Sequence, residues 1–307
     1  MNLVTVTCLI AYAGFVEWGW GWRTLLEQWG RIGAGPVLAA LALLTSTYFL
    51  RCYRIHDYFP EETAGRFLQL FRLTQIHNIL NIMLPFRAGE TSFPILMRSE
   101  FSVPLARATS ALLVMRLLDL HALLAAAGIG LVIANGNALW AWIAWTVFLV
   151  APLGFFALKR PLIAFAKNRL PRKLEGVVME IEAGMPSGHA GFLRAWAMTV
   201  INWVVKVLVL AWALELMGVS PIAASFGGAL GGELSSVLPL HAPGGVGTYP
   251  AGITAGAIAF GAASGKPEIG ALAQASINAH LLIVASALVG TALALVLSRG
   301  GAAPGKR

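Results

Sequence analysis

Oppositely charged side chains stand in closely spaced pairs inside long apolar stretches of this sequence. Arg87 and Glu90 are three positions apart, and Arg116 and Asp119 repeat that spacing, which puts the second pair on one face of a helix. A charge at the centre of a bilayer costs at least ~2.5 kcal/mol, so such residues usually pair with one another or line a polar cavity. Arginine suits two-pronged binding of a phosphate, and a carboxylate suits an amine.

More polar residues share these apolar surroundings, and we expect them to line a substrate-binding site. The full expected set is Arg87, Glu90, Asn81, His77, Asn78, Arg116, Asp119, Glu233, His241 and Lys206. For each charged pair, a salt bridge that merely joins two helices remains the alternative. Two cysteines, Cys8 and Cys52, are too few for a disulfide framework or a metal cluster, and we expect no metal, cofactor or catalytic residue.

A repeated motif interrupts two of the apolar stretches. Residues 84–90 read LPFRAGE and residues 238–247 read LPLHAPGGVG, and each copy leads to an aromatic-Pro pair. Proline ends a helix because it lacks the backbone donor, and glycine permits conformations that other residues avoid. The expected backbone of the two tips comprises Pro85, Gly89, Pro239, Pro243, Gly244, Gly245 and Gly247. Broken helices at matching positions of two halves indicate the central site of a transporter.

Composition indicates a polytopic membrane protein. Of the 307 residues 58% are hydrophobic and 12% are charged, whereas soluble domains carry about 25% charged residues. The net charge of +8 fits basic cytoplasmic loops. Nucleic-acid binding is not expected, because no basic run alternates with aromatic residues as such a groove requires.

The elements that must position these residues follow from a bilayer's need for about 20 apolar residues per helix. We expect an all-α protein in one integral membrane domain, 1–307, with about six transmembrane helices and two re-entrant hairpins. The expected spans are 3–18, 33–50 (stopping at Arg51 and Arg54), 105–133, 138–158, 195–217 and 270–297, and the expected hairpins are 64–99 and 221–263. A Trp-rich stretch at 18–31 looks interfacial.

Basic residues predict the orientation. The linker 159–193 is the most basic loop and should be cytoplasmic, which puts both termini on that side. Each half then crosses the membrane three times, an odd number, so the second half is inverted relative to the first. We therefore expect an inverted structural repeat, with one copy at about 1–133 and the other at about 138–298.

The motif set resembles a known family. Asn81-x-x-Leu84-Pro85-x-Arg87-x-Gly89-Glu90, Arg98, Arg116-Leu117-Leu118-Asp119 and the second tip resemble the lysylphosphatidylglycerol synthase transmembrane family, which includes the flippase half of the bacterial multiple peptide resistance factor. The resemblance covers about residues 30–297 and implies a lipid-translocating fold in a bacterial inner membrane. The soluble synthase domain of that factor is not expected here.

Two positions depart from the family pattern. Pro250 stands where the family usually has Glu, and Met115 stands where many members have an acidic residue. Glu233, about one turn before the second break, is the candidate to replace the missing acid. The implied substrate is a membrane phospholipid or a polyprenyl-phosphate-linked lipid, moved between leaflets.

Two other functions stay open. The protein could be a non-transporting partner or scaffold of a lipid-modifying enzyme. It could also hydrolyse lipid phosphates, because Pro186-Ser187-Gly188-His189 matches the central motif of membrane phosphatases. That chemistry needs a further His nucleophile and an orienting Asp, and Ser298-Arg299 is followed by neither, so we do not expect an enzyme. The sequence leaves the oligomeric state open.

Overall fold

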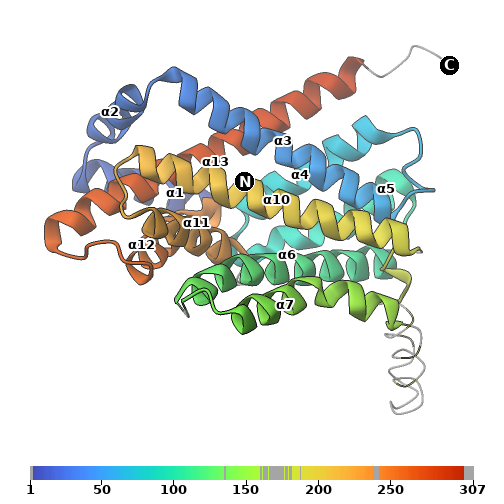
Figure 1. Ribbon diagram of the computed structural model, residues 1–307. Helices are drawn as coiled ribbons and strands as arrows, with labels where there is room; N and C mark the ends of the chain where they lie inside the picture. The colour runs from blue at the N-terminus through green and yellow to red at the C-terminus, as the bar shows by residue number, and fades with distance from the viewer. Residues whose placement is uncertain are drawn as a thin grey trace. The chain divides into compact units, whose positions relative to one another are not determined.

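The computed structural model describes residues 3–134, 136–159, 188–237 and 242–300, with short pieces between 161 and 186. Among these residues every regular element is helical, which confirms the all-α prediction (Figure 1). The α-helices of this part of the chain are α1 (Leu3–Gly19), α2 (Trp22–Ile32), α3 (Ala34–Tyr58), α4 (Phe67–Met83), α5 (Ser92–Phe101), α6 (Leu105–Ala134), α7 (Leu139–Ala157), α10 (His189–Leu216), α11 (Ile222–Val237), α12 (Thr248–Ala259) and α13 (Lys266–Gly300). Two 3-10 helices, η1 (Pro85–Thr91) and η2 (Pro243–Gly245), occupy the two predicted breaks.

The chain forms two compact units. Unit 1 comprises Met1–Tyr48, Thr74–Glu90 and Val204–Arg307, and unit 2 comprises Phe49–Leu73 and Thr91–Trp203. Helices α3, α4 and α10 therefore contribute residues to both units. The first tip, 84–90, and the whole of the second predicted hairpin belong to unit 1, although they come from opposite halves of the sequence.

Five helices of the described residues are long and apolar enough to cross a bilayer: α3, α6, α7, α10 and α13. Helix α7 packs along α6 in unit 2 (Figure 1). Only 11% of its most apolar 18-residue stretch is buried inside the protein. Its exposed side chains include Leu139 and Val147. A soluble monomer rarely shows so large an apolar face, whereas lipid covers it in a membrane. The chain is thus an integral membrane protein.

Helix α1 was expected as a sixth span. It is 17 residues long, and its apolar portion, Val6–Gly19, is shorter than the five spans. A bilayer core of about 30 Å needs about 20 helical residues. The sixth crossing therefore stays a prediction.

Two predicted boundaries are wrong. The second span was expected to stop at Arg51 and Arg54, but α3 continues to Tyr58, because Arg54 has an internal counter-charge described below. The basic linker was expected to reach residue 193, but α10 begins at His189. Most of the remaining linker lies outside the described residues.

The first broken segment doubles back on itself. Helix α4 ends at Met83, immediately before the predicted Leu-Pro break. Near the far end of α5, Glu100 accepts hydrogen bonds from Gln69 (2.5 Å) and Arg72 (3.1 Å) in the first turns of α4. Because residues 69–72 and 100 are in contact, α4, η1 and α5 form a helical hairpin whose two ends lie together.

Gly89 serves this hairpin by its small size. A Cβ atom added to Gly89 would lie 2.4 Å from Cα of Asn81 and 2.4 Å from the carbonyl oxygen of Leu80, closer than any side chain tolerates. Its backbone does not adopt the left-handed region, since no positive φ belongs to it. The expectation that Gly89 supplies an unusual conformation is therefore wrong, and close packing of η1 on α4 explains the residue.

The second broken segment is also a hairpin, built from α11, η2 and α12. Glycines let its two helices approach closely: an added Cβ would lie 2.1 Å from a backbone oxygen at Gly231 (facing Gly252) and at Gly256 (facing Gly227). Helix α11 ends at Val237, just before the predicted break. At the tip the backbone needs glycine for its conformation, because Gly244, Gly245 and Gly247 have φ of 69°, 69° and 74°, as the sequence predicts.

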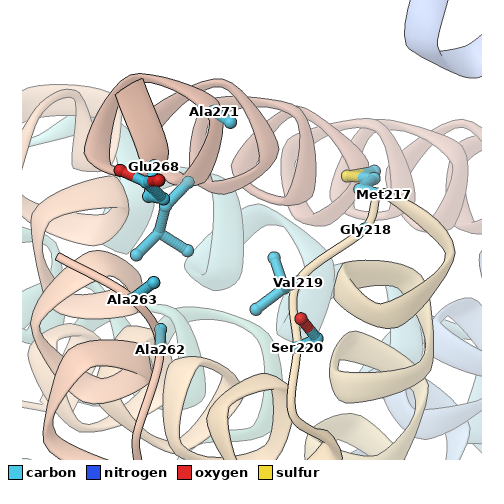
Figure 2. A pocket seen from close by; sticks show the side chains of 9 residues that line it. Met217, Gly218, Val219, Ser220, Ala262, Ala263, Glu268 and Ala271 are labelled. Carbon is cyan, nitrogen blue, oxygen red and sulfur yellow. The ribbon is translucent and has the colours of Figure 1, made fainter. Parts of the chain in front are cut away.

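The two ends of the second hairpin also lie together. The loop that enters α11 and the loop that leaves α12 line a cavity of about 160 Å³ against the first turns of α13 (Figure 2). Met217 and Val219 come from the first loop, Ala262 and Ala263 from the second, and Glu268 from α13. The C-terminal end of α10 is thus beside the base of this hairpin.

Candidate functional site

A buried carboxylate on α6 forms the centre of a charged cluster in unit 2. Asp119 accepts hydrogen bonds from Nη1 of Arg54 at 2.5 Å and from Nε1 of Trp203 at 2.9 Å. Nη1 of Arg116, one turn before Asp119, donates to the same carboxylate at 3.3 Å. We call Arg54, Arg116, Asp119, Thr199 and Trp203 the Asp119 cluster. It joins α3, α6 and α10.

The two arginines of the Asp119 cluster differ in exposure. The side chains of Arg54 and Asp119 are 4% and 2% exposed, and that of Arg116 is 19% exposed. Arg54 spreads across Asp119 with both terminal nitrogens and also donates to Thr199 at 2.9 Å. Arg54 is therefore a fully buried partner of Asp119, whereas part of the Arg116 side chain is exposed at the surface of the protein.

Two buried donors beside this cluster lack a protein acceptor. Within the described residues, Nε of Arg54 and the hydroxyl of Tyr58 are buried and make no hydrogen bond, and the two residues are one turn apart on α3. Buried polar groups without partners are rare in native structures and usually meet water or a ligand. Nε of Arg54 and the hydroxyl of Tyr58 are thus the two buried polar atoms of this region for which the described residues supply no partner.

A second buried carboxylate organises unit 1. Glu233 on α11 is 1% exposed and accepts from Nζ of Lys206 at 2.9 Å. Its other oxygen accepts from the hydroxyl of Tyr249 at 3.0 Å, and the Tyr249 ring stacks on His280 of α13. We call Lys206, Glu233, Ser236, Tyr249 and His280 the Glu233 cluster. It ties both arms of the second hairpin to α10 and α13.

The Glu233 cluster bears on the prediction that Glu233 replaces the acidic residue which the family usually has at the position of Pro250. Glu233 is inside the protein and does not point into lipid. Lys206, which the sequence predicts as a member of the same substrate-binding set, is its ion-pair partner. Arg87 and His241, two other members of the expected substrate-binding set, have side chains outside the described part of the structure, so a common site with Glu233 stays a prediction.

The first tip carries the remaining predicted residues. His77 and Asn78 are buried on α4, whereas Asn81 and Glu90 are half-buried. The side-chain amide of Gln75, one turn from Asn78, is buried with no hydrogen-bond partner in the described residues. The Arg87 side chain lies outside the described residues, so the expected pairing of Arg87 with Glu90 stays a prediction. Pro239 and His241 of the second tip also lie outside them.

Sequence reasoning missed Arg54 and Tyr249, and also Thr199 and Trp203 of the Asp119 cluster. Arg54 was interpreted as the end of a span, and Tyr249 was noted only as part of the aromatic-Pro pair. For Arg54 a signal existed, because the apolar helical pattern continues through Ile55, Tyr58 and Phe59. For Tyr249 no local signal points to Glu233, since the two are brought together only by packing of α12 on α11.

Other polar residues have structural roles. Asn278 of α13 accepts from the Trp29 ring nitrogen at 2.9 Å and donates to the Leu25 carbonyl at 2.9 Å, which fastens α2 to α13. His189, from the phosphatase-like tetrapeptide, begins α10 and meets Phe156 edge-on. Ser187 lies outside the described residues.

The membrane-length helices, the two helical hairpins and the buried ion pairs define a polytopic α-helical membrane protein with a polar interior. The family model of the lysylphosphatidylglycerol synthase TM region matches residues 2–273, and the chain belongs to this family, which is linked to lipid modification or translocation. No curated protein and no solved structure matches the chain.

Proposed function

We propose that this protein moves a polar, phosphate-bearing lipid between the leaflets of a bacterial inner membrane. The observation that carries the proposal is the pair of charged clusters buried within a lipid-family membrane protein. A charge held in a membrane is expensive, and where it persists it usually marks a substrate or ion pathway. Asp119 and Glu233 are both 2% exposed or less, and each is bound by basic side chains.

The two hairpins support the same proposal. Broken helices near the midplane present freed backbone groups to a substrate, which transporters exploit where two repeats meet. Here both breaks fall at a Leu-Pro step, and unit 1 contains both tips. Irregular backbone at membrane depth is tolerated only inside protein or beside a polar cavity. We therefore propose that the two hairpins are re-entrant and that the lipid headgroup passes between their tips.

Charged contacts support a cytoplasmic base for the first hairpin. Arg107 bonds Glu62, and Arg194 bonds Asp57 at 2.6 Å. These contacts gather the end of α3 and the starts of α6 and α10 at one side of unit 2. The end of α7 lies there too, since Phe156 stacks on Phe192 of α10, and the basic linker 159–193 follows α7 in the sequence. Basic residues concentrate on the cytoplasmic side. We propose that both termini are cytoplasmic and that the second hairpin, whose base adjoins the other end of α10, opens from the opposite face.

A leaflet-resolved assay tests the transport proposal. The purified chain is reconstituted into liposomes that carry a trace of fluorescent phosphatidylglycerol, and dithionite quenches the label in the outer leaflet only. A transporter raises the quenched fraction above the level of protein-free vesicles. Arg23→Gln, on exposed α2, is the control that should transport normally. Absence of movement with intact lipid supports the scaffold alternative and refutes transport, and release of phosphate would identify a hydrolase.

A further inference from the structure

A long apolar groove lies between α6 and α7, which are joined by a short loop and pack side by side in unit 2 (Figure 1). Its volume is about 420 Å³. The lining side chains recur at every fourth position, as Leu124, Gly128 and Val132 on α6 and as Trp140, Ala144 and Phe148 on α7. Residues four apart share one face of a helix, so the groove runs straight along both helices for about 12 Å. We call it the α6–α7 groove.

Trp145 keeps the two helices apart at this groove. Its ring nitrogen donates to the carbonyl of Ala125 on α6 at 2.7 Å. The ring rests on Gly128, where an added Cβ would lie 2.9 Å from the Trp145 side chain. Small residues usually let two membrane helices approach closely, but here the ring fills the space over Gly128. The groove is therefore maintained by a side chain that is itself anchored.

His121 fixes the end of the groove at Phe148. Pro152 lies inside α7 and has no N–H, so the carbonyl of Phe148, four residues earlier, lacks its usual helical donor. Nε2 of His121 donates to that carbonyl at 2.8 Å, and the two rings stack with their centroids 4.5 Å apart. Two side-chain hydrogen bonds thus set the spacing of α6 and α7, and the groove is preformed, as ligand sites usually are.

The position of the groove limits what can fill it. Helix α7 is the least buried of the five spans, and the rim side chains of Trp140 and Phe148 are exposed, so the groove opens toward the lipid. An apolar cavity does not hold water, and an empty one forfeits dispersion contacts along its walls. Hydrocarbon or another protein surface must therefore occupy it.

The width of the groove excludes a helix. Its volume divided by its length gives a cross-section of about 35 Å², whereas a helix about 10 Å across has a cross-section of roughly 80 Å². The exposed rings of Trp140 and Phe148 also hold a second backbone away, whereas membrane helices associate through small residues at the contact. A single hydrocarbon chain is narrow enough, and in a bilayer it lies parallel to α6 and α7.

We infer that the α6–α7 groove binds one acyl chain of a membrane phospholipid, which lies lengthwise between the two helices. Lipid hydrocarbon already surrounds α7, so binding gains nothing from the hydrophobic effect. The preference for the groove comes from dispersion contacts with walls that need no reorganisation. The lining residues belong neither to the two charged clusters nor to the two hairpins, so the inference does not depend on the proposed transport.

Photolabelling of the full chain tests this site. The protein is reconstituted into phosphatidylglycerol liposomes with a trace of phosphatidylglycerol that carries a diazirine in the middle of one acyl chain, and labelled positions are mapped by mass spectrometry after irradiation. Val147, next to Phe148 in the sequence, is exposed and lies outside the groove, so it reports contact with bulk lipid at a similar depth. We expect label at Leu124 to exceed label at Val147 by at least about threefold, equivalent to about 0.7 kcal/mol.

Filling the groove should remove this excess. In Ala144→Phe a ring enters the groove from an exposed position, and label at Leu124 should fall to the level at Val147. Ile143→Phe adds a ring at the neighbouring exposed position, which does not line the groove, and should leave the excess unchanged. Ala144→Leu is measured in parallel, because the larger ring can prevent folding, and should reduce the excess in the same direction.

Three results overturn the inference. The first is equal wild-type labelling of Leu124 and Val147, and the second is an excess that persists in a folded Ala144 variant. The third comes from size-exclusion chromatography with light scattering: a wild-type dimer that Ala144→Phe, but not Ile143→Phe, converts to a monomer would show that a second copy occupies the groove. If neither Ala144 variant folds, the wild-type labelling decides.

Discussion

Removal of Arg54 should destabilise this protein more than removal of any surface charge. In Arg54→Met the apolar volume of the side chain is largely kept, but Asp119 loses two contacts, at 2.5 and 3.4 Å. Asp119 stays 2% exposed in the wild-type packing and cannot recover the interaction from water. The perturbation therefore tests whether the Asp119 cluster holds α3 against α6.

The expected magnitude follows from the contacts that remain. Breaking a buried ion pair by removing one partner costs about 3–5 kcal/mol. Asp119 keeps the Trp203 donor at 2.9 Å and Arg116 at 3.3 Å, so the lower end applies. We expect a loss of about 3 kcal/mol in the free energy of unfolding, or roughly 150-fold in the folded-to-unfolded ratio, since 1.4 kcal/mol is tenfold.

Reversible unfolding in mixed micelles of rising SDS fraction, followed by far-UV circular dichroism, measures this loss. Arg23→Met is the control, because its pair with Glu27 is exposed and should contribute less than about 1 kcal/mol. Adding Asp119→Leu to Arg54→Met removes the orphaned charge and should recover part of the stability. A single variant within about 1 kcal/mol of wild type, or a double variant less stable than the single one, would refute the reasoning.

Three further outcomes are expected. Gly231→Ala should destabilise the second hairpin by about 2 kcal/mol or more through overpacking, whereas Gly270→Ala, where nothing lies within 4 Å of an added Cβ, should be neutral or stabilising in the same SDS titration. Arg87→Lys and Arg87→Ala should both reduce leaflet movement with normal expression, because Lys lacks the planar fork that grips phosphate; full transport by Arg87→Ala would make this residue structural. Ala64→Cys and Ser102→Cys place a single cysteine before α4 and after α5, in a background without other cysteines. Both should react with an impermeant maleimide from the same side of the membrane, and labelling from opposite sides would refute the re-entrant hairpin.

The sequence by itself determined the class of protein and the places where its helices break. Chain composition and the lengths of the apolar stretches reflect burial in lipid, which acts on each segment alone. A proline ends a helix by its own covalent structure, so α4 stops where the first Leu-Pro step predicts, and α11 is described up to Val237, immediately before the second. The Arg116–Asp119 contact was also predictable, because an i, i+3 spacing on one helix is local geometry.

Only the tertiary structure decided which distant groups meet. Arg54 contacts Asp119 and Lys206 contacts Glu233 because the helices that carry them pack with a particular rotation and register. All the side chains along a helix–helix interface together determine that rotation and register. The same holds for Gly89, whose need for close approach depends on where η1 folds onto α4. Local pattern identifies a buried charge, but its partner lies on another helix, and the packing of that helix is a property of the assembled chain.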